Sequence, residues 1–379
     1  MNKLKHYQSA IKSCLYTCMN ARKGYTTNRK IVVIESDDWG SVRIPSKEVF
    51  DRMSALKLDV IGNNYNENDS LATKEDLSLL FDVLSGYKDC QENSPVITAN
   101  TCVANPDFEK IKASDFSTYF YEPFTTTLER YPNCSFDSWK EGMAAHVFVP
   151  QFHGREHLNV EKWMSELRKG NPELKTCFDL QTWGVRYNNL QENVLGEFLV
   201  NSNQSIELQK VALKEGMQLF KEIFGYVSKS FIAPCYIWNP ELNEALKQLG
   251  VDVLQGGYFQ HLSKEGRIID TSYHYMGQKN DLGQVYLVRN CLFEPTQDHR
   301  LNKEHCLKGI EKAFRLKKPA IISTHRLNFI GAIRPENRDN NLRQFSDLLK
   351  AITMRWPDVE FMSSDELGDY INDSSLLVG

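Results

Sequence analysis

The sequence lacks the long apolar run that a membrane-spanning helix requires. Its first 24 residues are basic but contain no sustained apolar stretch and no small-residue cleavage site, so we expect no signal peptide. It also lacks an excess of one charge, because 45 Lys and Arg residues face 49 Asp and Glu residues. No stretch concentrates one sign, which argues against a nucleic-acid or anionic-membrane partner. We therefore expect a cytoplasmic protein without a transmembrane segment.

Internal repeats, low-complexity tracts and Pro/Gly/Ser-rich linkers are missing as well, so nothing divides the chain. The nine cysteines are odd in number and scattered, which fits reduced thiols better than a disulfide framework. Cys14 and Cys18 stand four apart, but no second close pair completes a metal site, so we interpret them as two buried thiols. We expect an N-terminal helical extension over residues 1–28 and one domain over residues 29–379.

What the sequence does contain is an alternation of short β-rich runs and helical patterns. Runs that are apolar on both faces, with helices between them, are typical of parallel strands covered by helices. The pattern predicts an α/β fold: a deformed (β/α) barrel of seven or eight parallel strands with helical insertions, with a doubly wound sheet as the alternative. The β-rich runs lie at residues 30–35, 95–100, 145–151, 229–233, 251–254, 284–289, 319–323 and 359–362.

Helical periodicity is clearest at residues 205–224, 240–249 and 340–353. Two segments do not follow the strand–helix rhythm, namely the aromatic-rich stretch 115–143 and the stretch 174–203. We interpret both as insertions on the catalytic face.

The first candidate site follows the run at 30–35, where the sequence continues with SDDWG and places Asp37 and Asp38 at a strand end. In β/α folds, functional groups gather where strands end and loops begin. Two adjacent carboxylates raise each other's pKa. A cation would relieve that repulsion, with one Asp as its ligand and the other free to accept a proton. The alternative is a turn or a helix N-cap, where Asp is common.

The second candidate site is HGREH, which follows the run at 145–151. On a helical turn, residues four apart share a face, so His153 and His157 could reach one metal ion. The alternatives are a surface histidine pair and a histidine that caps a helix C-terminus. His146, at the other end of the strand, fits a structural role better.

Two further strand ends carry candidate residues. His325 follows the run at 319–323, where an imidazole is well placed for general acid–base catalysis, although a hydrogen-bonded structural histidine is the competing interpretation. After 229–233 comes PCYIW, in which Pro234, Tyr236 and Trp238 either wall a sugar site or close the barrel.

The coincidence of these signals is stronger than any one of them. An Asp at one strand end and paired histidines at another offer a metal ion one oxygen and two nitrogen ligands. Such a set leaves positions open for water and substrate, as in a catalytic metal site. His325 at a third strand end would then supply the acid.

In this order the segments resemble the polysaccharide deacetylases, the NodB-homology domain of carbohydrate esterase family 4. The family's first motif, TFDDG, resembles ESDD at 35–38, which Trp39 and Gly40 follow. Its second, H-S/T-x-x-H, matches HGREH in spacing. Its third, R-x-P-Y/x-G, falls near IAPCY at 232–236, and its last, L-x-H, falls at STH, 323–325. The resemblance covers roughly residues 30–370 as motifs in order.

This resemblance implies a deformed β/α barrel and a metal-dependent deacylation. By it, Asp37 is the general base and His325 the general acid. Asp38, His153 and His157 bind a divalent ion, most simply Zn²⁺, with Co²⁺, Ni²⁺ or Mn²⁺ as alternatives. The expected substrate-binding residues are Trp39, Pro234, Tyr236, Trp238 and Arg326.

The chain departs from the family pattern at several positions. Ile232 stands where the third motif has the arginine that orients the base, and Gly154 replaces the small hydroxyl residue of the second motif. No fourth motif is clear, so we expect Glu294 or Asp298 to orient His325. The candidates to replace the missing arginine are Arg43, Arg155, Arg289 and Arg326.

We expect a metal-dependent hydrolase that removes N- or O-linked acetyl groups from a carbohydrate-containing substrate. A cytoplasmic location favours a soluble or lipid-linked glycan intermediate over a mature wall polymer. One alternative is a metal-independent glycoside hydrolase that uses Asp37 and Glu294 as its carboxylate pair. The other is a non-catalytic glycan-binding or scaffold protein on the same barrel. Neither alternative explains His153, His157 and His325 together.

Overall fold

A nine-stranded sheet forms the centre of the computed structural model, which describes residues 16, 18–58, 60–183 and 194–373. Every pairing within this sheet is parallel, and the order is β10-β7-β6-β5-β2-β1-β12-β11, with β13 beside the first half of β1. The strands are β1 (Lys30–Trp39), β2 (Ile97–Thr101), β5 (Phe148–Phe152), β6 (Ser230–Phe231), β7 (Val253–Gly256), β10 (Val285–Val288), β11 (Cys291–Leu292), β12 (Ala320–His325) and β13 (Val359–Met362).

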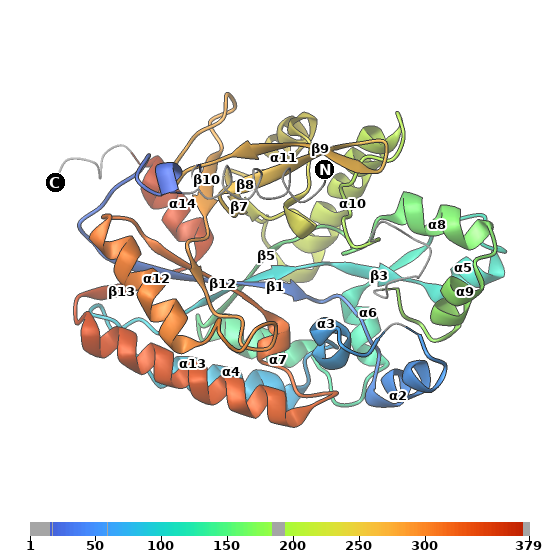
Figure 1. The fold of residues 1–379 in the computed structure, drawn as a ribbon, viewed down its shortest axis with the longest axis horizontal. Coiled ribbons are helices and arrows are strands. Elements are labelled where there is room, and N and C mark those ends of the chain that lie inside the picture. Colours follow the sequence, from blue (N-terminus) through green and yellow to red (C-terminus); the bar gives the residue numbers. More distant parts are fainter. Residues whose placement is uncertain (1–15, 17, 59, 184–193, 374–379) are drawn as a thin grey trace, which may run out of the picture.

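The sheet curls into a deformed barrel, and the chain itself joins its two ends (Figure 1). Strands β10 and β11 are the ends of the order, yet only Arg289 and Asn290 separate them in sequence. The amide of Arg289 donates to Gly256 O at the end of β7, and the amide of Asn290 donates to Ile321 O on β12. Two consecutive residues therefore belong to opposite ends of the sheet. The predicted fold class is confirmed.

Each of the eight β-rich runs of the sequence overlaps a strand of this sheet. The ninth strand, β11, was not expected, because two residues are too few to show any periodicity. Burial explains the apolar runs: in β1, every residue from Ile31 to Trp39 is buried. A strand covered on both faces has no reason to alternate polar and apolar residues.

Helices cover the barrel from several sides. In Figure 1, α4, α7 and α13 lie below the sheet, and α10 and α11 lie above it. The helices are α2 (Lys47–Ala55), α3 (Asn64–Asn68), α4 (Lys74–Ser85), α5 (Phe108–Ala113), α6 (Phe124–Glu129), α7 (Phe136–Ala144), α8 (Val160–Arg168), α9 (Pro172–Asp179), α10 (Ser205–Phe224), α11 (Asn243–Gln248), α12 (Lys303–Arg315), α13 (Pro335–Arg355) and α14 (Ser364–Asn372), with 3₁₀ turns η1 (Pro234–Tyr236), η2 (Pro240–Leu242) and η3 (Arg326–Asn328).

The three predicted helices are present. Helix α10 has the predicted bounds and ends at Gly225, whose φ of 80° is the left-handed conformation that favours glycine at a helix C-terminus. The expected helix at 340–353 lies within α13, and the one at 240–249 is divided into η2 and α11.

The two segments expected on the catalytic face differ in where they lie. Residues 115–143 contain β4 (Tyr121–Pro123), which pairs with β3 (Ala104–Pro106), and they also contain α6 and α7. Trp139 of α7 packs against Trp39 and Phe148 in the main core, so the expectation of a catalytic-face insertion is wrong for α7. Tyr119 of the same segment donates to Glu156, which lies between the two histidines in sequence. Residues 174–203, where described, do approach the site: Trp183 stacks on His157 and Leu195 lines the cavity there. A hairpin of β8 (Phe259–Lys264) and β9 (Arg267–Tyr273) was not foreseen.

The described part of the proposed N-terminal extension attaches to the barrel. Lys318 Nζ donates to the carbonyls of Lys23, Gly24 and Tyr25, while residues 1–15 and 17 lie outside the described residues. Among the described helices, none combines the length and the apolar character needed to cross a bilayer. The described cysteines are all free thiols. Cys18 is exposed, so its interpretation as a buried thiol is wrong, and Cys14 lies outside the described residues.

Candidate active site

Asp37 and Asp38 lie in an irregular part of β1. In a regular strand, neighbouring side chains point to opposite faces of the sheet. Here the register against β2 shifts between Ser36 and Trp39, and Asp38 has a φ of 73°. This local irregularity lets both carboxylates line one cavity at the carboxyl end of the barrel.

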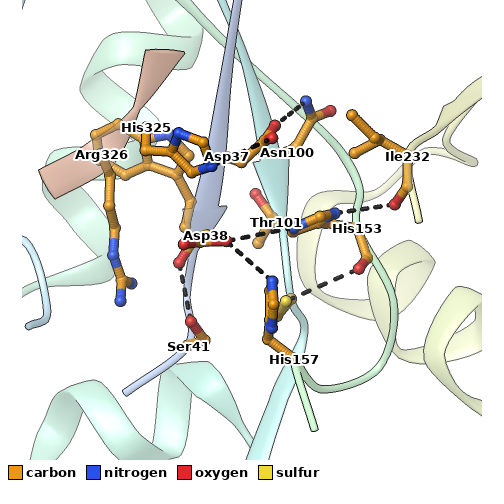
Figure 2. A network of polar contacts seen from close by, with 12 residues as sticks. Asp37, Asp38, Ser41, Asn100, Thr101, His153, His157, Ile232, His325 and Arg326 are labelled. Atoms are coloured by element: carbon orange, nitrogen blue, oxygen red, sulfur yellow. Dashed lines mark hydrogen bonds and ion pairs between the residues drawn. The ribbon is translucent and has the colours of Figure 1, made fainter. Parts of the chain in front are cut away.

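Asp38, His153 and His157 form a compact buried cluster. The Nε2 atoms of His153 and His157 lie 3.4 and 3.3 Å from Asp38 Oδ1 (Figure 2). One ligand atom from each residue fits within 4.8 Å of the others. The expected helical turn is absent, however: residues 153–157 are a loop between β5 and α8. The two imidazoles meet because the loop bends, and not because of helical spacing.

The donor atoms of this cluster fit a divalent metal ion. His153 Nδ1 faces Ile232 O at 2.9 Å, and the opposite nitrogen, Nε2, has no hydrogen-bond partner among the described residues. A carbonyl on one imidazole nitrogen fixes the tautomer that leaves the other free for a metal. Burial lowers the pKa of His157 to about 4, against the opposing effect of Asp38, so its imidazole is neutral at pH 7. Neutral imidazole is the form that binds metals.

Asp37 is held by an arginine from a distant strand. Arg289 Nη1 and Nη2 each donate to one Asp37 oxygen at 2.6 Å, and Asn100 Nδ2 donates to Asp37 Oδ1 at 2.7 Å. Burial raises the pKa of Asp37, but the charge and hydrogen bonds of Arg289 outweigh it and hold this pKa below its usual range. Arg289 also donates from Nε to Glu35 Oε2 at 2.6 Å. A fully buried arginine between two carboxylates keeps Asp37 ionised and fixed in orientation.

The structure therefore shows which of the four candidate arginines contacts Asp37. Arg289 alone makes the bidentate contact with Asp37. Arg43 binds Asp69 and lies 3.8 Å from Asp38, and Arg155 binds Glu156 and Glu215. Ile232 keeps a role at the position of the missing arginine, because its carbonyl contacts His153.

His325 lies across the cavity from the histidine pair. Its Nε2 is 3.8 Å from Asp37 Oδ2, and its Nδ1 is 2.5 Å from Glu294 Oε1. Burial lowers the pKa of His325, but the charge of Glu294 outweighs it and raises this pKa to about 9. Of the two acids considered, Glu294 is thus the partner, whereas Asp298 binds the exposed Arg300.

The cavity that these groups line measures about 310 Å³. Its walls include Asn63, Tyr65 of α3, Leu195, Cys235 and Tyr236, and the hydroxyl of Tyr236 accepts from Arg289 Nη1 at 3.3 Å. Asn63, Tyr65 and Leu195 were not anticipated, because no local pattern marks them. Asn100 could have been found from the sequence, because it is a polar residue at the end of the β-rich run 95–100. A larger cavity of about 810 Å³ around Glu360 opens at the other end of the barrel and contains none of these groups.

Several expected substrate-binding residues lie elsewhere, which corrects the sequence-based assignment. Trp39 is packed in the core and donates from Nε1 to Ser36 Oγ, and Trp238 is buried and donates to Asn243 Oδ1. Arg326 is buried and binds Asp69, and its side chain runs away from the cluster in Figure 2. Pro234 is buried beside the wall without lining it. Of the five, Tyr236 reaches the cavity.

No protein-family model and no curated protein matches the chain. Similar solved structures include an inferred glycoside hydrolase/deacetylase from Parabacteroides distasonis, with 8% identity and a TM-score of 0.47 over 92% of this chain and 72% of that one. An inferred polysaccharide deacetylase from Mycobacterium smegmatis has 10% identity and a TM-score of 0.41 over 93% and 94%. The 4-α-glucanotransferase from Thermococcus litoralis has 10% identity and a TM-score of 0.45 over 89% of this chain, which spans 40% of that protein.

Proposed function

We propose that this chain is a metal-dependent hydrolase that removes an acetyl group, bound as an amide or an ester, from a carbohydrate-containing substrate. The observation that carries the proposal is the buried cluster of Asp38, His153 and His157, in which His153 Nε2 has no hydrogen-bond partner among the described residues. Leaving such a buried polar atom unpaired costs about 1–3 kcal/mol. A divalent ion would remove that cost. Two nitrogen donors and one oxygen donor suit Zn²⁺, and the same set accepts Co²⁺, Ni²⁺ or Mn²⁺.

Asp37 is proposed as the general base. Arg289 and Asn100 hold both of its oxygens, so its orientation is set before a substrate arrives. A carboxylate of low pKa is a weak base. A divalent ion beside it would polarise the acyl carbonyl and acidify a water sufficiently for such a base.

His325 is proposed as the general acid. The charge of Glu294 beside Nδ1 raises the pKa of His325 and keeps its imidazole protonated at neutral pH. The other nitrogen, Nε2, faces Asp37. From there it would donate a proton to the leaving amine or alcohol. The proposed base, Asp37, and the proposed acid, His325, thus line the same cavity from the ends of two strands.

The size of the cavity supports a small substrate. At about 310 Å³ it lies near the lower end of the range of small-molecule pockets, which is about 300–1,000 Å³. Tyr65 and Tyr236 offer rings of the kind that pack against sugars. We therefore propose that one acylated sugar unit enters, either free or at the end of a longer glycan.

The glycoside hydrolase alternative is disfavoured by the position of Glu294. Its Oε1 contacts His325 Nδ1, and its Oε2 accepts from Asn328 Nδ2 at 2.9 Å. Glu294 is buried behind His325 and does not line the cavity, so it cannot pair with Asp37 across a glycosidic bond. The remaining alternative is a non-catalytic binding protein on the same barrel, and acetate release distinguishes it from a hydrolase.

The test combines metal content with acetate release. Wild type, His153→Ala/His157→Ala and Asp37→Asn are purified without a histidine tag and reconstituted with Zn²⁺. Elemental analysis should find about one ion per chain in wild type and Asp37→Asn, and none in the double variant. Of these three proteins, only the wild type should release acetate from N- and O-acetylated sugars. The control His146→Ala/His299→Ala removes two exposed imidazoles and should behave as the wild type.

Two outcomes contradict the proposal in different ways. A wild type that takes up no Zn²⁺, Co²⁺, Ni²⁺ or Mn²⁺ removes the metal mechanism. A wild type that binds one ion at the cluster but releases acetate from no acetylated sugar supports the non-catalytic binding protein.

A further inference from the structure

The loop that carries both histidines contains a glycine with an unusual backbone. Gly154 has a φ of 110°, and a Cβ added there would collide with Glu197 Oε2. The second motif of the deacetylase family has a small hydroxyl residue at this position, which this chain lacks. The space that such a side chain would need is occupied instead by the carboxylate of Glu197.

One side of this loop is attached to the strand region 101–104. The amide of His153 donates to Thr101 O at 3.0 Å, and the amide of Ala104 donates to Arg155 O at 2.8 Å. The amide of Val103 donates to Gly154 O at 3.4 Å. These bonds hold the loop from one side only.

Glu197 contacts the loop from the other side. The amide of Arg155 donates to Glu197 Oε1 at 3.3 Å, while Oε2 lies against Gly154. The backbone on either side of Glu197 is held in place, because Asn159 Nδ2 donates to the carbonyls of Gly196 and Leu199, at 3.0 and 2.9 Å. Its side chain is buried, and Oε2 has no hydrogen-bond partner among the described residues.

We propose that Glu197 is a positioning residue for the metal ligands, which clamps the loop so that His153 and His157 both face Asp38. This inference rests on the proposed metal-dependent function. It also explains Gly154: any larger residue would displace Glu197. The segment around residue 197 thereby becomes part of the metal site without supplying a ligand. Supports of this kind typically change metal affinity about 10- to 100-fold.

The experiment is a Co²⁺ titration of the metal-free protein, followed by the visible absorption of the bound ion. Glu197→Ala should weaken Co²⁺ binding about 10- to 100-fold. Glu197→Gln should stay within about threefold of wild type, since an amide oxygen also accepts from Arg155 and fills the same space. The matched control Glu215→Ala removes a carboxylate that binds the side chain of Arg155 and should leave the affinity unchanged. Equal affinity in Glu197→Ala and wild type, or an equal loss in Glu215→Ala, overturns the proposal.

A double-mutant cycle tests the explanation of Gly154. The backbone strain of Gly154→Ala is the same whether or not Glu197 is present, so it cancels in the cycle. Gly154→Ala should therefore reduce Co²⁺ affinity by a larger factor in the wild type than in Glu197→Ala. Equal factors in both backgrounds would show that the two positions are independent.

Amide hydrogen exchange in the metal-free protein separates the clamp from the proposed function. Glu197→Ala should speed exchange at the Arg155 amide, whereas Glu215→Ala should not. If the wild type binds no Co²⁺, the proposed function fails. If exchange at Arg155 is unchanged in Glu197→Ala, the clamp itself is absent, whatever the metal affinity.

Discussion

At the scale of single residues, Arg289 links two carboxylates that stand two positions apart on β1. Glu35 and Asp37 point the same way along the strand, and Arg289, which lies between β10 and β11, reaches both. Ser364 Oγ donates to the remaining oxygen of Glu35. All three groups are buried. Burial raises the pKa of Glu35 against the opposing charge of Arg289, whereas Arg289 holds the pKa of Asp37 below its usual range.

Arg289→Lys should reduce kcat about 100-fold or more while Zn²⁺ content stays near one per chain. A lysine ammonium is a point charge and cannot bind both oxygens of Asp37 and also Glu35, so the base loses its orientation. The measurement is steady-state acetate release together with elemental analysis. Arg338→Lys is the control, because Arg338 is a buried arginine that binds Asp76 on α4, away from the site. An unchanged kcat in Arg289→Lys would contradict this role.

The pKa of His325 leads to a prediction about pH. An acid catalyst is active while protonated, so activity should fall as pH rises through its pKa, which Glu294 raises to about 9. Glu294→Gln keeps a hydrogen-bond acceptor for Nδ1 but removes the charge, so the basic limb of the kcat–pH profile should move to lower pH. Asp298→Asn removes a nearby exposed charge and should leave the limb in place. The opposite pattern would assign the partner of His325 to Asp298.

At the scale of elements, α10 crosses β5 closely at Gly216. A Cβ there would lie 2.8 Å from Phe152 Cζ and 3.0 Å from Arg155 Cβ. Phe152 precedes the loop 153–157 that carries both histidines, and Arg155 belongs to it. Alanine favours a helix over glycine by about 1 kcal/mol, but overpacking costs about 1–3 kcal/mol. Gly216→Ala should therefore lower the free energy of unfolding, by about 1 kcal/mol net.

Urea unfolding of Gly216→Ala checks this prediction. The control is Lys214→Ala on the exposed face of the same helix, which should stay within about 0.5 kcal/mol of the wild type. A stabilised Gly216→Ala would mean that α10 moves outward without cost and that the contact with β5 is loose.

At the scale of the whole molecule, the site collects residues from almost the full length of the chain. Asp37 and Asp38 come from β1, Asn100 from β2, the histidine pair from the loop after β5, and His325 from β12. In the sheet, β1 lies between β2 and β12, and β5 follows β2. Parallel strands end at one rim of the barrel, so these side chains converge although they are far apart in sequence.

The sequence by itself determined which segments become strands and which strand ends carry carboxylate or imidazole groups. Both properties are local: a buried strand needs an apolar run, and a strand end is the next residue along the chain. That is why the eight β-rich runs, and the two aspartates, the histidine pair and His325 beyond them, could be identified without a structure.

Only the tertiary structure decided which partner each of these groups has. Arg289 reaches Asp37 because the barrel brings its two ends together, and Glu197 reaches Gly154 because a distant segment folds over the loop. The tertiary structure also decided that Trp39 packs in the core, since an irregularity in β1 changes which side chains face the cavity. Such contacts depend on strand order and side-chain direction, which local sequence patterns do not encode.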